Sequence, residues 1–240
     1  MAAEPVEPDS DERADRVLDA AAELLLRWGY RRVTIEDVAR RAGIGKGTVY
    51  LHFRTKDAMF LTVLLRSQRR LFADLADRME ADPTIALPWR MVRVLYDVLG
   101  SDDVARALYM GDSEVLGRLA QEAAGTIGEL SRRRDDAVRE HFRLLRAAGL
   151  VAADLTLDEQ VHSFGAVSAG FFFAAGTPRE MDPFAPADPA RRAELLEHVL
   201  RSVLRGPADP AVAADVAPAV AALYRPLVEH IDSEWQRRAR

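Results

Sequence analysis

The chain has 240 residues, of which 49% are hydrophobic and 30% charged, and it contains no cysteine. This length and composition are ordinary for a soluble globular protein of one or two domains. The lack of cysteine excludes disulfides and thiolate metal sites. The longest nearly apolar run, residues 164–176, is too short to cross a bilayer as a helix, and the acidic start of the chain lacks the apolar core of a secretory signal. We therefore expect a cytoplasmic protein.

Charge is unevenly distributed along the chain, whose formal net charge is -5. Residues 1–12 hold five acidic and no basic side chains, which predicts a disordered acidic tail. Residues 13–56 hold ten basic and five acidic side chains, a net charge of +5, so residues 57–240 carry a net charge of -5. A basic block next to an acidic body is typical of a DNA-binding head, although a solvated basic surface would give the same pattern.

Helical periodicity extends along the sequence, whereas the alternation typical of strands is scarce, so we predict an all-α fold. Apolar side chains at positions 17–28 share one face of a first helix, and Gly29 ends it. Thr34 begins a short second helix, because its hydroxyl can accept a hydrogen bond from a backbone amide. Asp37 completes a short variant of the capping box. This second helix ends at Gly43.

Helical patterns continue after the second helix. A third short helix is expected at about 45–51, and Thr55 can cap a long fourth helix from Lys56 to about Ala81. Residues 177–190 contain four prolines and are expected to form a loop. Further helices are expected near residues 87–99, 102–109, 113–123, 126–148, 158–174, 189–205 and 211–238.

Residues 34–53, TIEDVARRAGIGKGTVYLHF, predict a helix-turn-helix, because a tight turn that contains glycine joins two short helices. In such a motif the second helix enters the DNA major groove and presents its N-terminal residues to base edges. Gly45 and Gly47 let the backbone approach DNA closely. The side chains that offer donors to DNA are Lys46, Thr48 and Tyr50.

The stretch 17–60 resembles the DNA-binding domain of TetR-family regulators. In this family an alanine-rich first helix, a Gly-Tyr pair and a Thr-capped second helix precede a short recognition helix, and a lysine begins the long helix that follows. The family often has serine at the position of Gly45, so this chain lacks a hydroxyl contact to DNA there. The matching residues are Ala20-Ala21, Gly29-Tyr30, Thr34, Ala42-Gly43, Gly47-Thr48, Tyr50, His52-Phe53 and Lys56.

The resemblance implies that the residues contacting DNA lie in and around the recognition helix. Most of these contacts are expected to go to phosphate, and Lys46 and Thr48 are the candidates for reading base edges. Tyr50 has an alternative interpretation as a packing residue, and His52 as a bridge between the third and fourth helices. The implied DNA contacts are Thr34, Gly45, Lys46, Gly47, Thr48, Tyr50, His52 and Lys56.

The resemblance also implies how the chain is divided. Residues 13–56 would form a three-helix DNA-binding domain, and residues 57–205 a larger helical domain that binds a small effector and forms the dimer. Residues 206–240 are expected to be a C-terminal helical extension. The larger domain is therefore where both the dimer interface and the effector pocket are expected.

Two apolar segments, residues 161–173 and 195–204, are the candidates for the dimer interface. The first is apolar nearly all round, which requires burial on several sides, and the second has a strong apolar stripe. Two such helices from each subunit would form a four-helix bundle about a two-fold axis, and ordinary packing within one subunit is the alternative. The predicted interface residues are Val161, Phe164, Gly165, Ser168, Ala169, Phe172, Leu196, Val199, Leu200 and Val203.

Aromatic and large apolar residues between positions 87 and 175 are the candidates for lining an effector pocket. Such pockets are mostly apolar with few polar anchors, which predicts an apolar or aromatic effector. The alternative for each residue is a place in the structural core. The candidates are Trp89, Tyr96, Tyr109, Met110, Phe142 and Phe164.

Together these patterns predict a dimeric transcriptional regulator, a repressor that a small, largely apolar effector releases from a palindromic operator, with no cofactor and no metal. A helical enzyme is one alternative, because Glu159 and His162 have the spacing of metal ligands on a helix. A di-iron bundle needs a second such pair, and the sequence has none. A nucleoid or adaptor protein with the same head is another alternative, and it would lack a ligand-sized cavity.

Overall fold

The computed structural model describes residues 10–116, 119, 124–178, 180–205 and 209–238, and these residues form helices and loops without a strand. The all-α fold expected from the sequence is confirmed. The helices are α1 (Ser10–Arg32), α2 (Ile35–Ala42), α3 (Lys46–His52), α4 (Lys56–Ala81), the 3-10 helix η1 (Pro83–Ala86), α5 (Pro88–Ser101), α6 (Asp103–Met110), α7 (Ser113–Leu116), α9 (Ala124–Ala147), α10 (Leu157–Ala175), α11 (Pro189–Leu204) and α12 (Pro210–Arg238).

The helix ends agree closely with the sequence pattern, with three differences. Gly29 has non-helical angles (φ 72, ψ 157) and interrupts the first helix as expected, but a short helical stretch follows it to Arg32. Residues 10–12, expected in a disordered tail, belong to α1. Residues 1–9 lie outside the described residues. The helix expected at 113–123 is described only as α7, since residues 117, 118 and 120–123 also lie outside them.

Thr34 and Asp37 form the expected capping box at the start of α2. The Asp37 amide donates to Thr34 Oγ1 over 3.2 Å, and the Thr34 amide donates to Asp37 Oδ2 over 3.1 Å. At the other end Gly43 has a φ of 69°, a left-handed conformation in which a side chain would be strained. These two caps fix the length of α2 and the direction in which the chain turns into α3.

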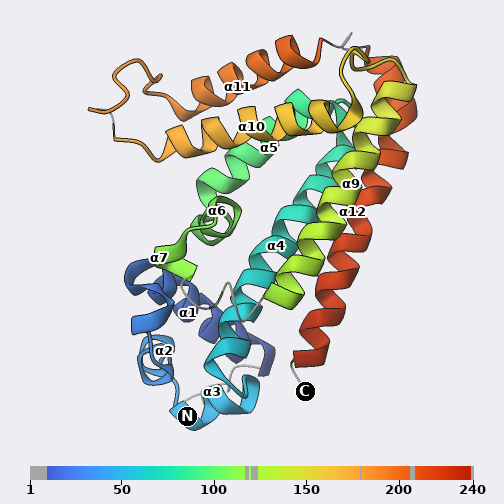
Figure 1. The fold of residues 1–240 in the computed structure, drawn as a ribbon. Coiled ribbons are helices and arrows are strands. Elements are labelled where there is room, and N and C mark those ends of the chain that lie inside the picture. The colour runs from blue at the N-terminus through green and yellow to red at the C-terminus, as the bar shows by residue number, and fades with distance from the viewer. Residues whose placement is uncertain (1–9, 117–118, 120–123, 179, 206–208, 239–240) are drawn as a thin grey trace, which may run out of the picture.

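Helices α1, α2 and α3 form a head at one end of the long helix α4 (Figure 1). A hydrophobic cluster, here called the head cluster, joins buried side chains of these helices to the first half of α4 and to Val104, Leu116 and Leu119 of the body. Because α4 contributes to this cluster and then continues into the body, one helix connects the two parts of the molecule.

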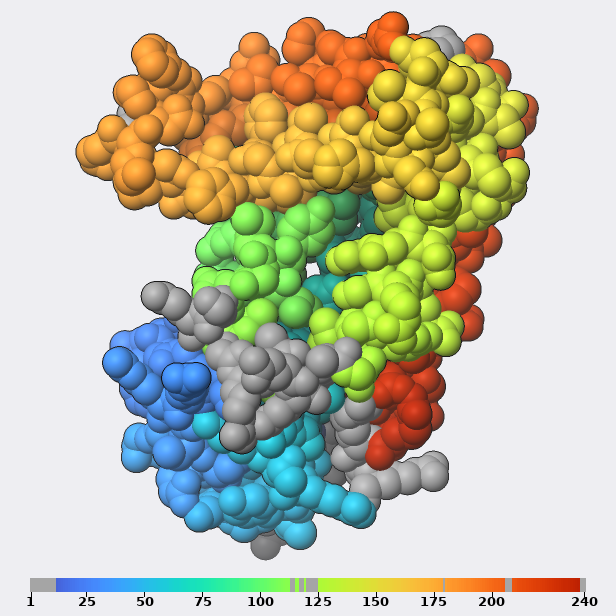
Figure 2. Space-filling model, viewed as in Figure 1, coloured from blue at the N-terminus to red at the C-terminus, as the bar shows by residue number. Residues whose placement is uncertain are grey.

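The body consists of long helices that run away from the head and two helices that cross their far end. Helices α4, α9 and α12 lie side by side, and α10 and α11 pack over α5 (Figure 1). In the space-filling view this α10–α11 layer overhangs the body at the end opposite the head (Figure 2). The body therefore has its own core, which includes the fully buried Trp89, Phe142 and Leu196.

Helix α12 is the expected C-terminal extension, and it is part of the body core. By length and composition alone, Pro210–Arg237 would be long and apolar enough to cross a membrane. In the structure one face of this helix, which includes Val220, Tyr224 and Ile231, is instead buried against the other helices of the body. Burial of this face accounts for the apolar composition of the helix.

A buried polar contact joins α12 to α9 and η1. His141 Nε2 lies 2.6 Å from the carbonyl oxygen of Ala86, and His141 Nδ1 lies 2.9 Å from Tyr224 Oη. Because a carbonyl oxygen only accepts, Nε2 carries the proton, and Nδ1 accepts from the tyrosine hydroxyl. Burial lowers the pKa of His141 to about 4, so the imidazole is neutral at physiological pH.

Candidate nucleic-acid interface

Helix α3 is held by one face and offers the other to solvent. Val49 is fully buried and Phe53, which follows the helix, is nearly so. Tyr50 and Leu51 are 44% and 83% exposed, and residues 45–47 at the N-terminus are exposed as well. The N-terminus and outer face of α3 are therefore accessible, which a recognition helix needs in order to enter a major groove.

Lys46 is exposed and forms an ion pair with Glu36 of α2. The hydrogen bond from Lys46 lowers the pKa of Glu36, and the same contact raises the pKa of Lys46. The ammonium also lies 5.8 Å from the centre of the Tyr50 ring. In the free protein the lysine predicted to read a base edge is therefore already engaged by an acidic side chain of the same surface.

Lys56 is directed towards the head instead of away from it. Its Nζ donates to the backbone oxygen of Tyr30 over 2.6 Å and lies 4.3 Å from the centre of the Tyr30 ring. The Tyr30 hydroxyl in turn donates to Asp57. His52 is half-buried, with its ring centre 6.3 Å from that of Phe53, a position compatible with the alternative of a bridge to α4. Lys56 thus joins α4 to the end of α1, and its contact to phosphate remains a prediction.

Other basic residues surround the motif. Arg31 and Arg32 end α1 and are exposed. Arg40 forms an ion pair with Asp37, and Arg41 lies 2.5 Å from Glu23. Exposed pairs of this kind contribute little to stability. Phosphate groups can therefore compete for both arginines at low cost.

The sequence interpretation missed the outward position of Leu51. The sequence contained a signal for it. Val49 and Phe53 are four positions apart and share the inward face of the helix, so Leu51, midway between them, points outward. An exposed leucine on a recognition helix fits the contact between an apolar side chain and a thymine methyl group.

Four of the residues predicted to line an effector pocket are buried members of the body core: Trp89, Tyr96, Phe142 and Phe164. Trp89 and Phe142 are fully buried, and Phe164 is 6% exposed. The ring centres of Phe142 and Phe164 are 5.3 Å apart, a normal aromatic contact. These side chains therefore belong to the structural core, which was the alternative to lining a pocket.

Tyr96, Tyr109 and Met110 border three separate hollows. Tyr96 lines a hollow of about 490 Å³ between α10 and α11, and Tyr109 lines one of about 60 Å³ between α4 and α9. Met110 lines a hollow of about 680 Å³ where the body meets the head. The structure thus does not gather the six candidates around one of these hollows, because ring positions on different helices are set by tertiary packing.

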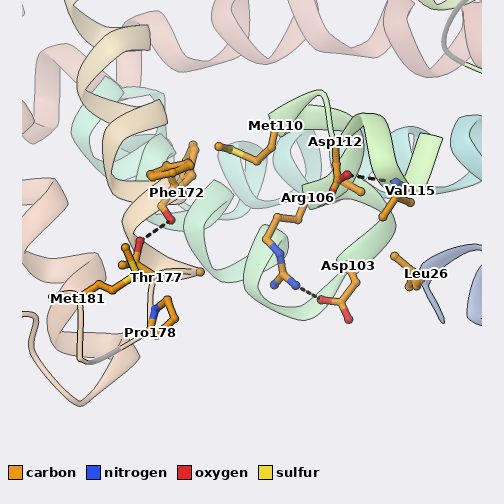
Figure 3. A pocket seen from close by; sticks show the side chains of 13 residues that line it. Leu26, Asp103, Arg106, Met110, Asp112, Val115, Phe172, Thr177, Pro178 and Met181 are labelled. Atoms are coloured by element: carbon orange, nitrogen blue, oxygen red, sulfur yellow. Dashed lines mark hydrogen bonds and ion pairs between the residues drawn. The ribbon is translucent and has the colours of Figure 1, made fainter. Parts of the chain in front are cut away.

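The hollow at the junction of head and body is shown in Figure 3. Leu26 of α1 forms one side, α6 forms the floor, and the end of α10 with residues 176–178 and Met181 forms the opposite side. Arg106 reaches into it and lies 2.6 Å from Asp103. Its walls therefore belong to both parts of the molecule and combine apolar side chains with a few charged ones.

The predicted dimer residues divide between the two faces of α10 and α11. The hydrophobic pattern of α10 could not determine which face is outward, because the helix is apolar nearly all round. Val161, Gly165 and Val199 are half-buried, and Ala169 and Val203 are exposed. The residues that turn into the core of their own protomer are Phe164, Ser168, Phe172, Leu196 and Leu200.

The outward face of α10 and α11 carries apolar residues that the sequence interpretation did not select. Phe173 is 70% exposed and Leu195 is 38% exposed. Ala166 and Gly170 lie on the same exposed face of α10. A surface with these side chains is unusual for a monomer and fits a contact with another protein surface.

Glu159 and His162 have the spacing of metal ligands, but the structure gives Glu159 another role. Glu159 accepts a hydrogen bond from the Thr156 amide over 2.8 Å and completes a capping box at the start of α10. Within the described residues, no group of three histidine or acidic side chains could hold a metal ion.

Residues 17–63 match the family profile described as bacterial regulatory proteins, tetR family. The HTH-type transcriptional regulator SrpR of Pseudomonas putida is 35% identical over 66 residues, which are 28% of this chain and 31% of SrpR. The chain spans less than half the length of the curated relatives it matches.

Solved structures resemble a larger part of the chain. NalD, the secondary repressor of the MexAB-OprM multidrug efflux pump in Pseudomonas aeruginosa, has a TM-score of 0.57 and 23% identity, with 82% of this chain and 98% of NalD covered. FadR from Bacillus subtilis, solved in complex with stearoyl-CoA, has a TM-score of 0.56 and 15% identity, with 78% of this chain and 96% of FadR covered. These likenesses show that head and body share the fold of transcriptional regulators.

Proposed function

The chain belongs to the TetR family of bacterial regulatory proteins, and we propose on this premise that it is a homodimeric, cytoplasmic transcriptional repressor. It binds a palindromic operator in double-stranded DNA and leaves it when a small, largely apolar effector binds. The named relatives and neighbours are regulators and not enzymes.

The accessible N-terminus and outer face of α3 are the observation that carries this proposal. Lys46 and Thr48 stand where a recognition helix reads base edges, and Leu51 adds an apolar contact. Thr34, Tyr50, His52 and Lys56 are assigned to phosphate, and Gly45 and Gly47 to close approach of the backbone. Phosphate contacts position the head, and the few base contacts specify the sequence.

The outward face of α10 and α11 supports the homodimer. Self-association about a two-fold axis would cover Ala169, Phe173, Leu195 and Val203, which are exposed in a single chain. The two helices from each subunit would then form a four-helix bundle. The heads would point the same way and meet successive major grooves about 34–36 Å apart.

The junction hollow supports an effector. With about 680 Å³ it has the size of a small-molecule site, which disfavours the adaptor protein that lacks a cavity. Met110, Phe172 and Met181 make much of its wall apolar. Because Leu26 of the head forms another wall, a movement of the head changes the shape of the site. A ligand bound there therefore has different affinities for two head positions, which is the condition for regulation.

Selection of DNA from a random pool by the purified protein tests the proposal. We expect enrichment of a palindrome, and we expect Lys46→Ala to lower the preference for the enriched site over random DNA by about tenfold. Arg132→Ala, which removes an exposed cation of the body, is the matched control and leaves the preference unchanged. Failure of the wild-type protein to enrich any sequence would remove the proposed function.

A further inference from the structure

We infer that Trp235 and Asp232, near the end of α12, are positioning residues for DNA binding, which hold the head at a fixed angle to the body. The dimer then accepts only one separation of the two half-sites. This inference rests on the proposed function and adds to it a role for the C-terminal helix.

Trp235 connects the last turns of α12 to the head. Figure 1 shows α12 descending along α4 to the level of the head. There the half-buried Trp235 packs against the head cluster, to which the first half of α4 also belongs. A hollow of about 740 Å³ separates the end of α12 from the tip of the head, with residues 51–53 on the head side and Asp232, Trp235 and Gln236 on the α12 side. Trp235 therefore contributes to the contact between α12 and the head cluster at the edge of this hollow.

Asp232 supplies the polar part of the connection. Its Oδ1 lies 2.5 Å from Arg69 Nε and its Oδ2 lies 3.3 Å from a terminal nitrogen of the same guanidinium, a two-point contact that fixes orientation. One turn earlier on α4, Arg66 is 7% exposed and binds Asp19 of α1 over 2.6 Å and Asp15 over 3.3 Å. Neighbouring arginines of α4 thus bind α12 and α1, and the three helices are linked at one level.

The rest of α12 is fixed to the body, so its end does not move independently. Tyr224 is buried and bonded to His141 of α9, and Ile231 is fully buried one turn before Trp235. On the outside, Arg225 lies 2.9 Å from Asp77 and 2.7 Å from Glu80 of α4. These contacts hold α12 to the body on both sides of its internal Pro226, so the end of the helix carries the position of the body to the contact made by Trp235.

The head is also held on its other side. Val104 of α6 and Leu116 of α7 belong to the head cluster. Loss of the α12 contact would therefore leave the head attached through α4, α6 and α7, but with one restraint fewer on its angle to the body. This loss would change the angle between the two recognition helices of a dimer. It would leave the fold of each head intact.

The separation of half-sites reports this angle. One inserted base pair rotates one half-site by about 34° and moves it by about 3.4 Å along the DNA axis. A dimer with restrained heads loses affinity for such DNA, whereas a dimer with loosened heads adapts to it. The ratio of affinities for the original and the shifted sites is independent of the fraction of protein that is folded.

The test uses the full chain and DNA that the wild-type protein has selected, with one or two base pairs inserted or removed between the half-sites. For Trp235→Ala and Asp232→Arg we expect the affinity loss caused by a one-base-pair change to shrink by about two- to thirtyfold. Trp235→Phe, and the charge exchange Arg69→Asp with Asp232→Arg, are expected to restore the wild-type spacing profile. Gln236→Ala changes a neighbouring exposed residue of the same hollow and serves as the control.

Wild-type spacing preference in Trp235→Ala would overturn the inference. An equal loss of affinity at every spacing would overturn it as well, because it would give Trp235 a merely structural role. If the wild-type protein selects no DNA, the proposed function itself has failed, and the two failures are thus distinguished.

Discussion

The neutral state of the buried His141 predicts a specific loss of stability in acid. The folded protein holds the imidazole with a pKa of about 4, whereas in the unfolded chain the ordinary value is about 6.5. Between these two values the unfolded chain binds a proton at this site and the folded protein does not. The free energy of unfolding therefore rises with pH in this window and falls as acid is added.

The size of the effect follows from the same two pKa values. Each tenfold change in proton affinity corresponds to about 1.4 kcal/mol, so protonation at His141 lowers the free energy of unfolding by roughly 3 kcal/mol once the pH is below 4. At pH 7.5 His141 is neutral in both the folded and the unfolded protein, so it no longer lowers the free energy of unfolding. At pH 5 about 2 kcal/mol of this loss has already occurred.

Urea unfolding of the wild-type protein and of His141→Gln, at pH 7.5 and pH 5, measures this contribution. Glutamine can form hydrogen bonds but does not titrate, so the wild-type protein should lose about 2 kcal/mol more than the variant between the two pH values. His198→Gln removes an exposed histidine and should behave as wild type. Equal losses in wild type and His141→Gln, together with a His141 ring that titrates near its ordinary pKa in NMR spectra, would refute the reasoning.

Three further predictions concern the DNA-binding and dimer surfaces. Glu36→Gln should tighten DNA binding, because it frees Lys46 and removes a negative charge from the DNA-facing surface. Glu129→Gln in the body is the control. Equal affinities of the two variants for DNA would contradict a role of Glu36 in restraining Lys46. Tyr50→Phe should weaken binding to all DNA sequences by a similar factor, and a loss confined to the selected site would instead make Tyr50 a base reader. Leu195→Arg should give monomers on sizing, since a charge would enter the proposed interface, and a stable dimer would place the interface elsewhere.

The head was predictable because its signals are local. Thr34, Asp37 and Gly43 are caps whose geometry depends on neighbouring backbone groups, and the structure shows the capping box and the left-handed glycine at these positions. The long helix likewise begins at Lys56 behind its Thr55 cap. Local hydrogen bonding and periodicity thus define the helix-turn-helix without tertiary information.

Features that depend on tertiary contacts could not be derived in this way. The pair between Lys46 and Glu36 joins residues ten positions apart, and the inward direction of Lys56 depends on Tyr30 of another helix. The all-round apolar character of α10 left its outward face undetermined. The aromatic residues chosen for the pocket lie on different helices, and only the packing decides which of them border a cavity.

The central claim is that α3 enters the DNA major groove, and cleavage from a probe on this helix tests it most directly. The natural sequence has no cysteine, so Leu51→Cys introduces a single attachment point on the exposed face of α3 for an iron chelate. Gly100→Cys on α5 of the body has open space around it and serves as the control. We predict cleavage of the selected DNA at two positions about one helical turn apart with the α3 probe and none with the α5 probe. Uncut DNA with the α3 probe, under conditions where the labelled protein binds, would contradict the account.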